Sequence, residues 1–347
     1  AIPQRRSPIP HSQRPRRHSR QRFRRRLCRR GSISQGFRRT EIKPLRRQPS
    51  FSAAFVSSEI RIENLLNLHR NTLWTLVALI ACGSLTNACA AESTNVKTPE
   101  ATVRELTGPD GRVTVTCSVY APRRPQRGAG LVVHLYGSGG SIRHGEYNVG
   151  RAPYAELRSL LSERGYWLVV PELGPKHWMN DVAEKRLDFV IATMVEHERV
   201  DPSRVHLLGS SMGGGSSLVY AMRHPDAIAS VVAIFPMTDF SRWLVEKPGY
   251  RSAVEKAHGI TADNRTSVLR KLSPLHHPAA FRTTPVQLLH GASDTTVGPH
   301  HSREFAAQLR AEGYAVHHRE VTGERHRDEI VRPYQTEIAD FLTRSAV

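Results

Sequence analysis

The segment Gly209 to Gly213 reads Gly-Ser-Ser-Met-Gly and constrains the fold of this chain more than any other stretch. The apolar run before it, residues 204–208, is typical of a buried strand, and residues 216–223 after it can form a helix. A serine between a strand and a helix, with small neighbours, is typical of a sharp, strained turn that exposes the hydroxyl. We therefore predict that Ser211 is a nucleophile; the alternative is a tightly packed glycine loop without chemistry.

A serine hydroxyl is a weak nucleophile, so it needs a base, and the base needs a carboxylate that orients it. Asp294 follows the expected strand 284–290, and His326 follows the expected strand 314–321 after a short turn. Catalytic groups of parallel sheets gather at the carboxyl ends of strands. We predict that Asp294 is the acid and His326 the base.

Other residues compete for these roles. Asp239 follows the expected strand 229–235, and Asp328 lies two residues after the predicted base. We expect Asp328 to begin the last helix, where a negative charge is favourable, and His290 to be a packed structural histidine.

Acyl transfer also needs hydrogen-bond donors for the oxyanion. One predicted donor is the backbone N–H of Met212, which follows the nucleophile. The other is expected from the glycine-rich loop 136–141, which follows the apolar run 131–135. The alternative is that this loop is only a flexible turn.

Two further segments carry a resemblance to a known family. Residues 201–205, which lead into the serine turn, and residues 273–275, ahead of 285–291 and Asp294, resemble the prolyl-oligopeptidase-like and dienelactone-hydrolase-like esterases of the α/β-hydrolase superfamily. The resemblance covers about residues 103–345. It implies a serine hydrolase with Ser211, Asp294 and His326 as nucleophile, acid and base.

The chain departs from that family at two positions. Tyr136 stands where a histidine often begins the oxyanion loop, so the second donor is the amide of Gly137 or Ser138, or the hydroxyl of Tyr136. Arg325 precedes His326, where many relatives have glycine. The family's oligopeptidases carry a large β-propeller, and this chain has no repeat of a blade-like period. We therefore expect a carboxylic ester as substrate; the alternative is a short peptide.

Strands alternate with helices along residues 103–347, which predicts one α/β domain with a mostly parallel, doubly wound sheet. The expected strands cover residues 103–107, 112–120, 131–136, 166–171, 204–209, 229–235, 284–290 and 314–321, and the expected helices cover 152–164, 181–200, 216–223, 302–312 and 327–343.

The insertion 237–283 is expected to form a small helical cap over the serine, with a helix near 266–272. Tyr136, Trp178 and Trp243 are candidates for lining a substrate pocket. The alternative is that the aromatic rings simply pack the cap on the core.

The formal charge of +19 is concentrated at one end of the chain. Residues 1–60 hold 17 Lys or Arg and two acids, and this Arg-, Ser- and Pro-rich segment cannot bury a core. Its arginines could neutralise phosphates, but it precedes a predicted signal segment. We therefore interpret it as the product of a mis-set translation start and expect no nucleic-acid partner.

Residues 61–92 are predicted to be a leader and 93–102 a polar tether. Nine apolar residues, 73–81, follow a short positive flank, which is typical of a signal peptide. Residues 79–83 resemble a bacterial lipobox, so we expect Cys82 to be lipidated and to anchor an extracytoplasmic bacterial protein in a membrane. Ordinary cleavage after Ala90 and a buried helix are the alternatives.

Cys117 is the only cysteine in the predicted catalytic domain, and a bond to Cys89 is possible. Two adjacent histidine pairs occur, His276–His277 and His300–His301. Because adjacent side chains do not easily face one ion, we expect no metal, and we expect no other cofactor.

Overall fold

The computed structural model of the chain describes residues 101–108, 111, 113–138 and 153–344. The Arg-rich segment 1–60, the leader with Cys82 and almost all of the tether lie outside these residues, and so does Cys89. Their assignments stay predictions. Within the described part of the chain, no helix is both long and apolar enough to cross a membrane.

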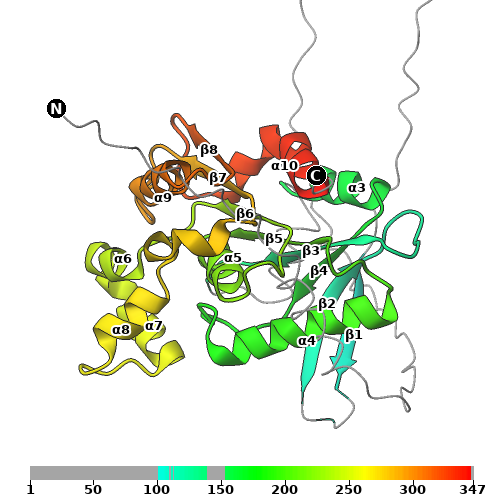
Figure 1. The fold of residues 1–347 in the computed structure, drawn as a ribbon, viewed down its shortest axis with the longest axis horizontal. Coiled ribbons are helices and arrows are strands. Elements are labelled where there is room, and N and C mark those ends of the chain that lie inside the picture. The colour runs from blue at the N-terminus through cyan, green and yellow to red at the C-terminus, as the bar shows by residue number, and fades with distance from the viewer. Residues whose placement is uncertain (1–100, 109–110, 112, 139–152, 345–347) are drawn as a thin grey trace, which may run out of the picture. The chain divides into compact units, whose positions relative to one another are not determined.

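One eight-stranded sheet organises the described residues (Figure 1). The strands are β1 (Thr102–Thr107), β2 (Thr114–Tyr120), β3 (Gly130–Leu135), β4 (Tyr166–Pro171), β5 (Val205–Ser210), β6 (Ser230–Ile234), β7 (Val286–Gly291) and β8 (Val316–Val321). Their order in the sheet is β1-β2-β4-β3-β5-β6-β7-β8. Strands β3 to β8 pair in parallel, whereas β2 is antiparallel to both of its neighbours. The predicted mostly parallel α/β-hydrolase sheet is confirmed.

Helices cover both faces of this sheet, with α3 and α10 on one side and α4 and α5 on the other (Figure 1). The helices of the core are α3 (Ala155–Glu163), α4 (Asp181–His197), α5 (Met212–Arg223), α9 (His300–Ala311) and α10 (Gln335–Thr343). Every residue of β3 to β7 is buried. Continuous apolar runs such as 131–133 in β3 are what a parallel strand covered on both faces requires.

Two helices differ most from their predicted bounds, whereas the ends of the other three predicted core helices shift by at most three residues. Helix α5 begins at Met212, so the three glycines expected to lie in a loop form its first turn. The predicted helix 327–343 is divided into a 3₁₀ segment, Asp328–Tyr334, and α10. Pro333 lies at the division, and proline removes a backbone donor from a helix interior.

The insertion after β6 forms several short helices. They are α6 (Phe240–Glu246), α7 (Arg251–His258) and α8 (Arg265–Lys271), with 3₁₀ turns at Pro248–Tyr250, Pro274–His276 and Pro278–Phe281. Trp243 of α6 packs on Trp178 of the core, with 5.3 Å between ring centroids, and on Tyr250, at 4.8 Å. These aromatic contacts fix the insertion to the part of the chain that follows β4.

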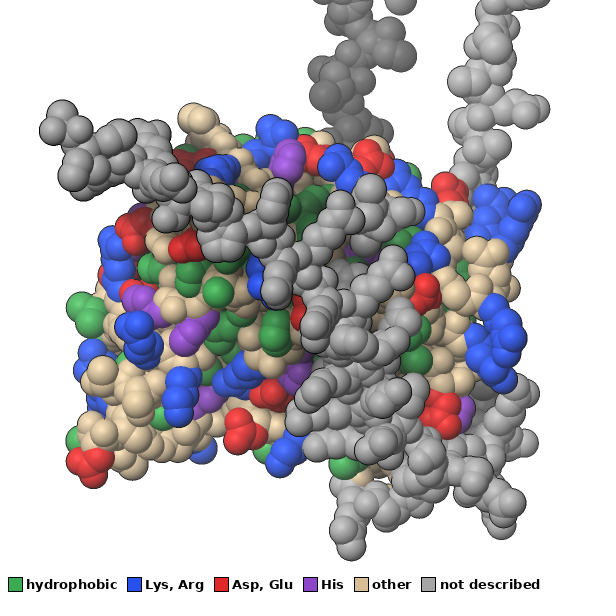
Figure 2. Space-filling view, viewed as in Figure 1, with side chains coloured by type: hydrophobic (Ala, Val, Ile, Leu, Met, Phe, Trp, Pro, Cys, Tyr) green, Lys and Arg blue, Asp and Glu red, His purple; other side chains and the backbone are tan. Residues whose placement is uncertain are grey.

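Charges of both signs are interspersed over the surface drawn in Figure 2. This agrees with the small formal charge of +4 that remains for residues 61–347 once the Arg-rich segment is set apart. Where described residues are drawn on this face, neither sign of charge forms a single patch.

Gly213 is expected to be irreplaceable for packing, because a Cβ at this position would overlap the carbonyl oxygen of Leu135 in β3. We expect Gly213→Ala to lower the free energy of unfolding by about 3 kcal/mol, the upper part of the range for overpacked cores. Gly249→Ala is the control, since an added Cβ there meets nothing within 4 Å. Urea unfolding of both variants measures the difference. Equal stability of the two variants would show that the close approach of α5 to β3 is not as described.

Candidate active site

Ser211 lies at the turn between β5 and α5 in a backbone conformation that non-glycine residues rarely adopt, with φ 54° and ψ −121°. Its N–H donates to the carbonyl of Ile234 in β6 at 2.9 Å. The turn needs glycine at position 209, because a Cβ there would overlap the backbone of Gly213. The strained turn predicted from the sequence is therefore present, and it directs the serine side chain away from the sheet.

His326 and Asp294 meet this serine in one chain of hydrogen bonds. The Nε2 atom of His326 lies 2.9 Å from Ser211 Oγ, and its Nδ1 atom lies 2.6 Å from Asp294 Oδ2. The loop that carries the histidine is tied to the loop that carries the acid, since Ser293 N–H donates to the Glu324 carbonyl at 2.8 Å. The structure thus brings together the three residues that the sequence predicts, from three different strand ends.

The carboxylate of Asp294 is held in one orientation. Its Oδ1 atom accepts the N–H groups of Thr296 and Val297 at 2.8 and 2.9 Å, which leaves Oδ2 for His326. Burial by itself would raise the pKa of Asp294, but hydrogen bonding with His290 and His326 outweighs it and holds the pKa below its usual range. Asp294 is therefore ionised near neutral pH and can stabilise a positive imidazolium.

His290 is the structural histidine that the sequence predicts, but it also touches the acid. It is fully buried, its Nδ1 atom lies 2.7 Å from Ser302 Oγ, and its Nε2 atom lies 2.8 Å from the Val297 carbonyl. The same Nε2 atom lies 3.4 Å from Asp294 Oδ2. The sequence gives a signal for this contact, since His290 and Asp294 are four residues apart across the end of β7.

The competing carboxylates have other partners. Asp239 caps α6 by accepting the N–H groups of Ser241 and Arg242. Asp328 begins a 3₁₀ segment rather than the last helix, which was expected to start there, and it accepts the hydroxyl proton of Tyr154 at 2.9 Å. Burial raises the pKa of Asp328. Neither carboxylate replaces Asp294 beside the histidine.

The backbone of the predicted oxyanion donors lies beside Ser211. Met212 is the first residue of α5, so its N–H has no partner within the helix. A Cβ added to Gly137 would lie 3.7 Å from the Cβ of Ser211, so the loop after β3 runs directly beside the nucleophile. Ser138 follows Gly137 in that loop, and residues 139–152 lie outside the described part of the chain. The backbone at 137–138 can therefore supply a second N–H.

The hydroxyl of Tyr136 is not such a donor, and that alternative is wrong. It donates to Glu172 Oε1 at 2.7 Å and accepts the N–H of Leu173 at 3.0 Å. Burial and the Glu172 carboxylate raise the pKa of this phenol far above its ordinary value. No sequence pattern pointed to Glu172, which follows β4, the strand beside β3.

The three candidate pocket residues, Tyr136, Trp178 and Trp243, are each only 1% exposed. Trp243 Nε1–H donates to the carbonyl of Thr296 in the acid loop at 3.1 Å. These contacts favour the alternative interpretation, in which the rings pack the insertion on the core, over the lining of a substrate pocket.

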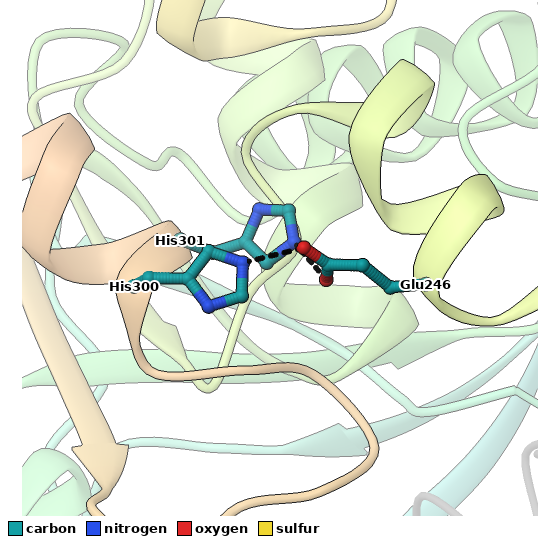
Figure 3. Close-up of side chains that lie close together, drawn as sticks. All are labelled: Glu246, His300 and His301. Atoms are coloured by element: carbon teal, nitrogen blue, oxygen red, sulfur yellow. Dashed lines mark ion pairs between the residues drawn. The ribbon is translucent and has the colours of Figure 1, made fainter.

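The structure describes Cys117 and the pair His300–His301, so it bears on the expectations about a disulfide and about a metal site. Cys117 has a free, buried thiol, and burial raises its pKa to about 12. Adjacent histidine side chains were expected not to face one ion easily, and this expectation is wrong for His300 and His301. Both rings turn toward Glu246, because that carboxylate, at the end of α6, lies opposite the start of α9 (Figure 3).

Comparisons with known proteins agree with this fold. The model of the prolyl oligopeptidase family matches residues 176–345. A puromycin-hydrolyzing peptidase of Mycobacterium tuberculosis superimposes with a TM-score of 0.59 at 19% identity, over 72% of this chain and 39% of that one. The S-formylglutathione hydrolase of Agrobacterium tumefaciens gives 0.58 at 18%, over 72% and 96%, and the acylaminoacyl peptidase of Pyrococcus horikoshii gives 0.56 at 14%, over 72% and 42%. No curated protein matches the chain.

The structural likenesses show the fold alone, and the chain spans about two fifths of the length of the two peptidases. The family match adds more, because residues 176–345 include the serine turn, the acid loop and the histidine loop. The part of the chain that carries the serine turn, the acid loop and the histidine loop therefore matches the prolyl oligopeptidase family, and its fold is similar to that of α/β-hydrolases.

Proposed function

We propose that this chain cleaves short peptides through an acyl-enzyme formed on Ser211. The observation that carries the proposal is the hydrogen-bonded chain from Ser211 Oγ through His326 to Asp294. His326 Nε2 takes the serine proton as Oγ attacks the carbonyl carbon of the substrate. Asp294 holds the imidazole by its Nδ1–H and stabilises the imidazolium that forms.

The oxyanion of the tetrahedral intermediate lies beside the start of α5. The N–H of Met212 and one N–H from Gly137 or Ser138 donate to it, and the helix dipole favours the negative charge. His326 then gives its proton to the leaving amine, and the C–N bond breaks. A water molecule, deprotonated by His326, releases the acyl group and restores Ser211.

The peptide assignment rests on the comparisons rather than on the pocket. The matching family is that of prolyl oligopeptidase, and two of the similar structures are peptidases. The ester preference expected from the sequence is the second candidate. It is favoured by the S-formylglutathione hydrolase, 96% of which this chain covers.

A comparison of amides with esters separates the two candidates. Aminoacyl- and prolyl-naphthylamides are assayed beside p-nitrophenyl esters of the same acyl groups, with Ser211→Ala as the background. An amide requires protonation of its leaving nitrogen, which the Asp294-supported His326 supplies. We expect kcat/KM for the best amide to equal or exceed that for its matching ester. If esters are cleaved and no amide rises above the Ser211→Ala background, the ester assignment is correct.

A further inference from the structure

The cluster of Glu246, His300 and His301 joins two parts of the chain that are far apart in sequence (Figure 3). Glu246 ends α6 of the insertion, and the histidines are the first two residues of α9, which follows the acid loop. Each residue offers one ligand atom, and these atoms lie within 4.8 Å of one another. Nothing in the proposed hydrolysis uses them.

Two nitrogen atoms of this cluster are buried without a hydrogen bond. Among the described residues, neither His300 Nε2 nor His301 Nε2 has a hydrogen-bond partner, and both are shut off from solvent. His300 Nε2 lies 2.9 Å from Glu246 Oε1, and His301 Nε2 lies 3.5 Å from Glu246 Oε2. The carboxylate therefore stands beside both nitrogens without the alignment that a hydrogen bond requires. Buried polar atoms are normally hydrogen-bonded, so we expect these two nitrogen atoms to have another partner.

We propose that Glu246, His300 and His301 bind one divalent transition-metal ion of the Zn²⁺ type. Two imidazoles and one carboxylate are a ligand set that Zn²⁺ takes in proteins, with water in the fourth position. The side chain of His301 is only 1% exposed, so this ligand would bind the ion on the inner side of the junction.

The neighbours of the cluster set how tightly the ion is held. Arg242 donates to Glu246 Oε1 at 2.8 Å, which leaves Oε2 as the available ligand oxygen and places a positive charge nearby. His301 Nδ1 lies 3.4 Å from the N–H groups of Thr238 and Asp239, and a metal on Nε2 would put a proton on Nδ1 and break these long contacts. Both features weaken binding, so we expect chelators to remove the ion readily.

The bound ion would hold the insertion against the catalytic core. Helix α6 already contacts the acid loop through Trp243 and Thr296, and α9 begins six residues after Asp294. An ion bound by residues of both α6 and α9 would add a second link between the insertion and the catalytic core. Metal binding should therefore stabilise the folded chain through mass action.

The test uses the full chain without a histidine tag, treated with EDTA and dialysed. Calorimetric titration with ZnCl₂ near neutral pH is expected to show one site per chain that is lost or weakened in His300→Ala and Glu246→Gln. The expected loss is at least about tenfold, since removing even a supporting partner of a metal ligand has that effect. The melting temperature of the wild type should rise with Zn²⁺, and tetrahedral Co²⁺ bands should appear in its visible spectrum.

The control is His317→Ala, because His317 is an exposed histidine of β8 outside the cluster and the chain has 18 histidines. It should bind Zn²⁺ as the wild type does. If His300→Ala does not fold, as judged by circular dichroism, Glu246→Gln alone decides. A wild type without Zn²⁺ binding would overturn the proposal, and so would variants that bind Zn²⁺ as tightly as the wild type.

Discussion

Replacing Ser211 with alanine is expected to lower kcat by about 10⁶-fold, the loss seen when a serine hydrolase is deprived of its nucleophile. Oγ is the atom that His326 Nε2 contacts at 2.9 Å, and no other described hydroxyl contacts that nitrogen. The residual rate should still exceed that in water, because the N–H of Met212 and the loop at Gly137 remain to bind the oxyanion.

Ser216→Ala is the matched control for this experiment. Ser216 lies in α5 one turn beyond the nucleophile, is 1% exposed, and its hydroxyl has no hydrogen-bond partner among the described residues. The variant removes the same kind of atom close to the nucleophile without touching the triad, so its kcat should stay within about twofold of the wild type, as expected for a change that costs little free energy. Equal activity of Ser211→Ala and Ser216→Ala on any substrate of the wild type would overturn the assignment of the nucleophile.

Asp294→Asn is expected to lower kcat by about 10⁴-fold, because an amide at this position favours the wrong tautomer of the base. The carboxylate Oδ2 accepts the proton of His326 Nδ1 at 2.6 Å. An Asn NH₂ group there would donate to Nδ1 instead, so that Nε2 would carry the proton and could not accept one from Ser211. The Asn oxygen can still accept the N–H groups of Thr296 and Val297, so the acid loop should keep its shape.

The control for this variant is Asp239→Asn. Asp239 also accepts two backbone N–H groups, at the start of α6, but it does not contact His326. Steady-state kinetics of both variants, with circular dichroism to verify folding, measure the difference. A loss of similar size in the two variants would mean that Asp294 acts through the structure of its loop rather than through the histidine.

The meeting of the three proposed catalytic residues was predictable because their positions follow from local patterns. Ser211, Asp294 and His326 each come directly after a recognisable strand, and parallel strands bring their carboxyl ends to one edge of the sheet. The strained turn at Ser211 followed equally from small residues between a strand and a helix. At these three positions, the residues next to the site are enough to predict the local structure.

Features that depend on distant contacts were not predictable. Glycine has low helix propensity, yet Gly213 and Gly214 lie in the first turn of α5, where β3 and β6 approach too closely for a Cβ. The Tyr136 hydroxyl is occupied by Glu172, a residue of a neighbouring strand end.

The convergence of His300 and His301 on Glu246 also depends on contacts between residues that are distant in sequence. It depends on how the insertion packs against α9, and no sequence spacing reveals that packing. Adjacent side chains of a helix are separated by about 100° around its axis, so the position of the pair in α9 does not by itself bring the two rings together.

Covalent labelling shows which residue is the nucleophile. The folded chain is treated with a fluorophosphonate, digested, and analysed by mass spectrometry, with Ser211→Ala, Ser216→Ala and heat-denatured wild type treated in parallel. The account predicts one adduct per chain on the peptide that contains Ser211, the same adduct in Ser216→Ala, and none in Ser211→Ala or in the denatured chain. An adduct on another residue, or equal labelling of Ser211→Ala, would contradict it.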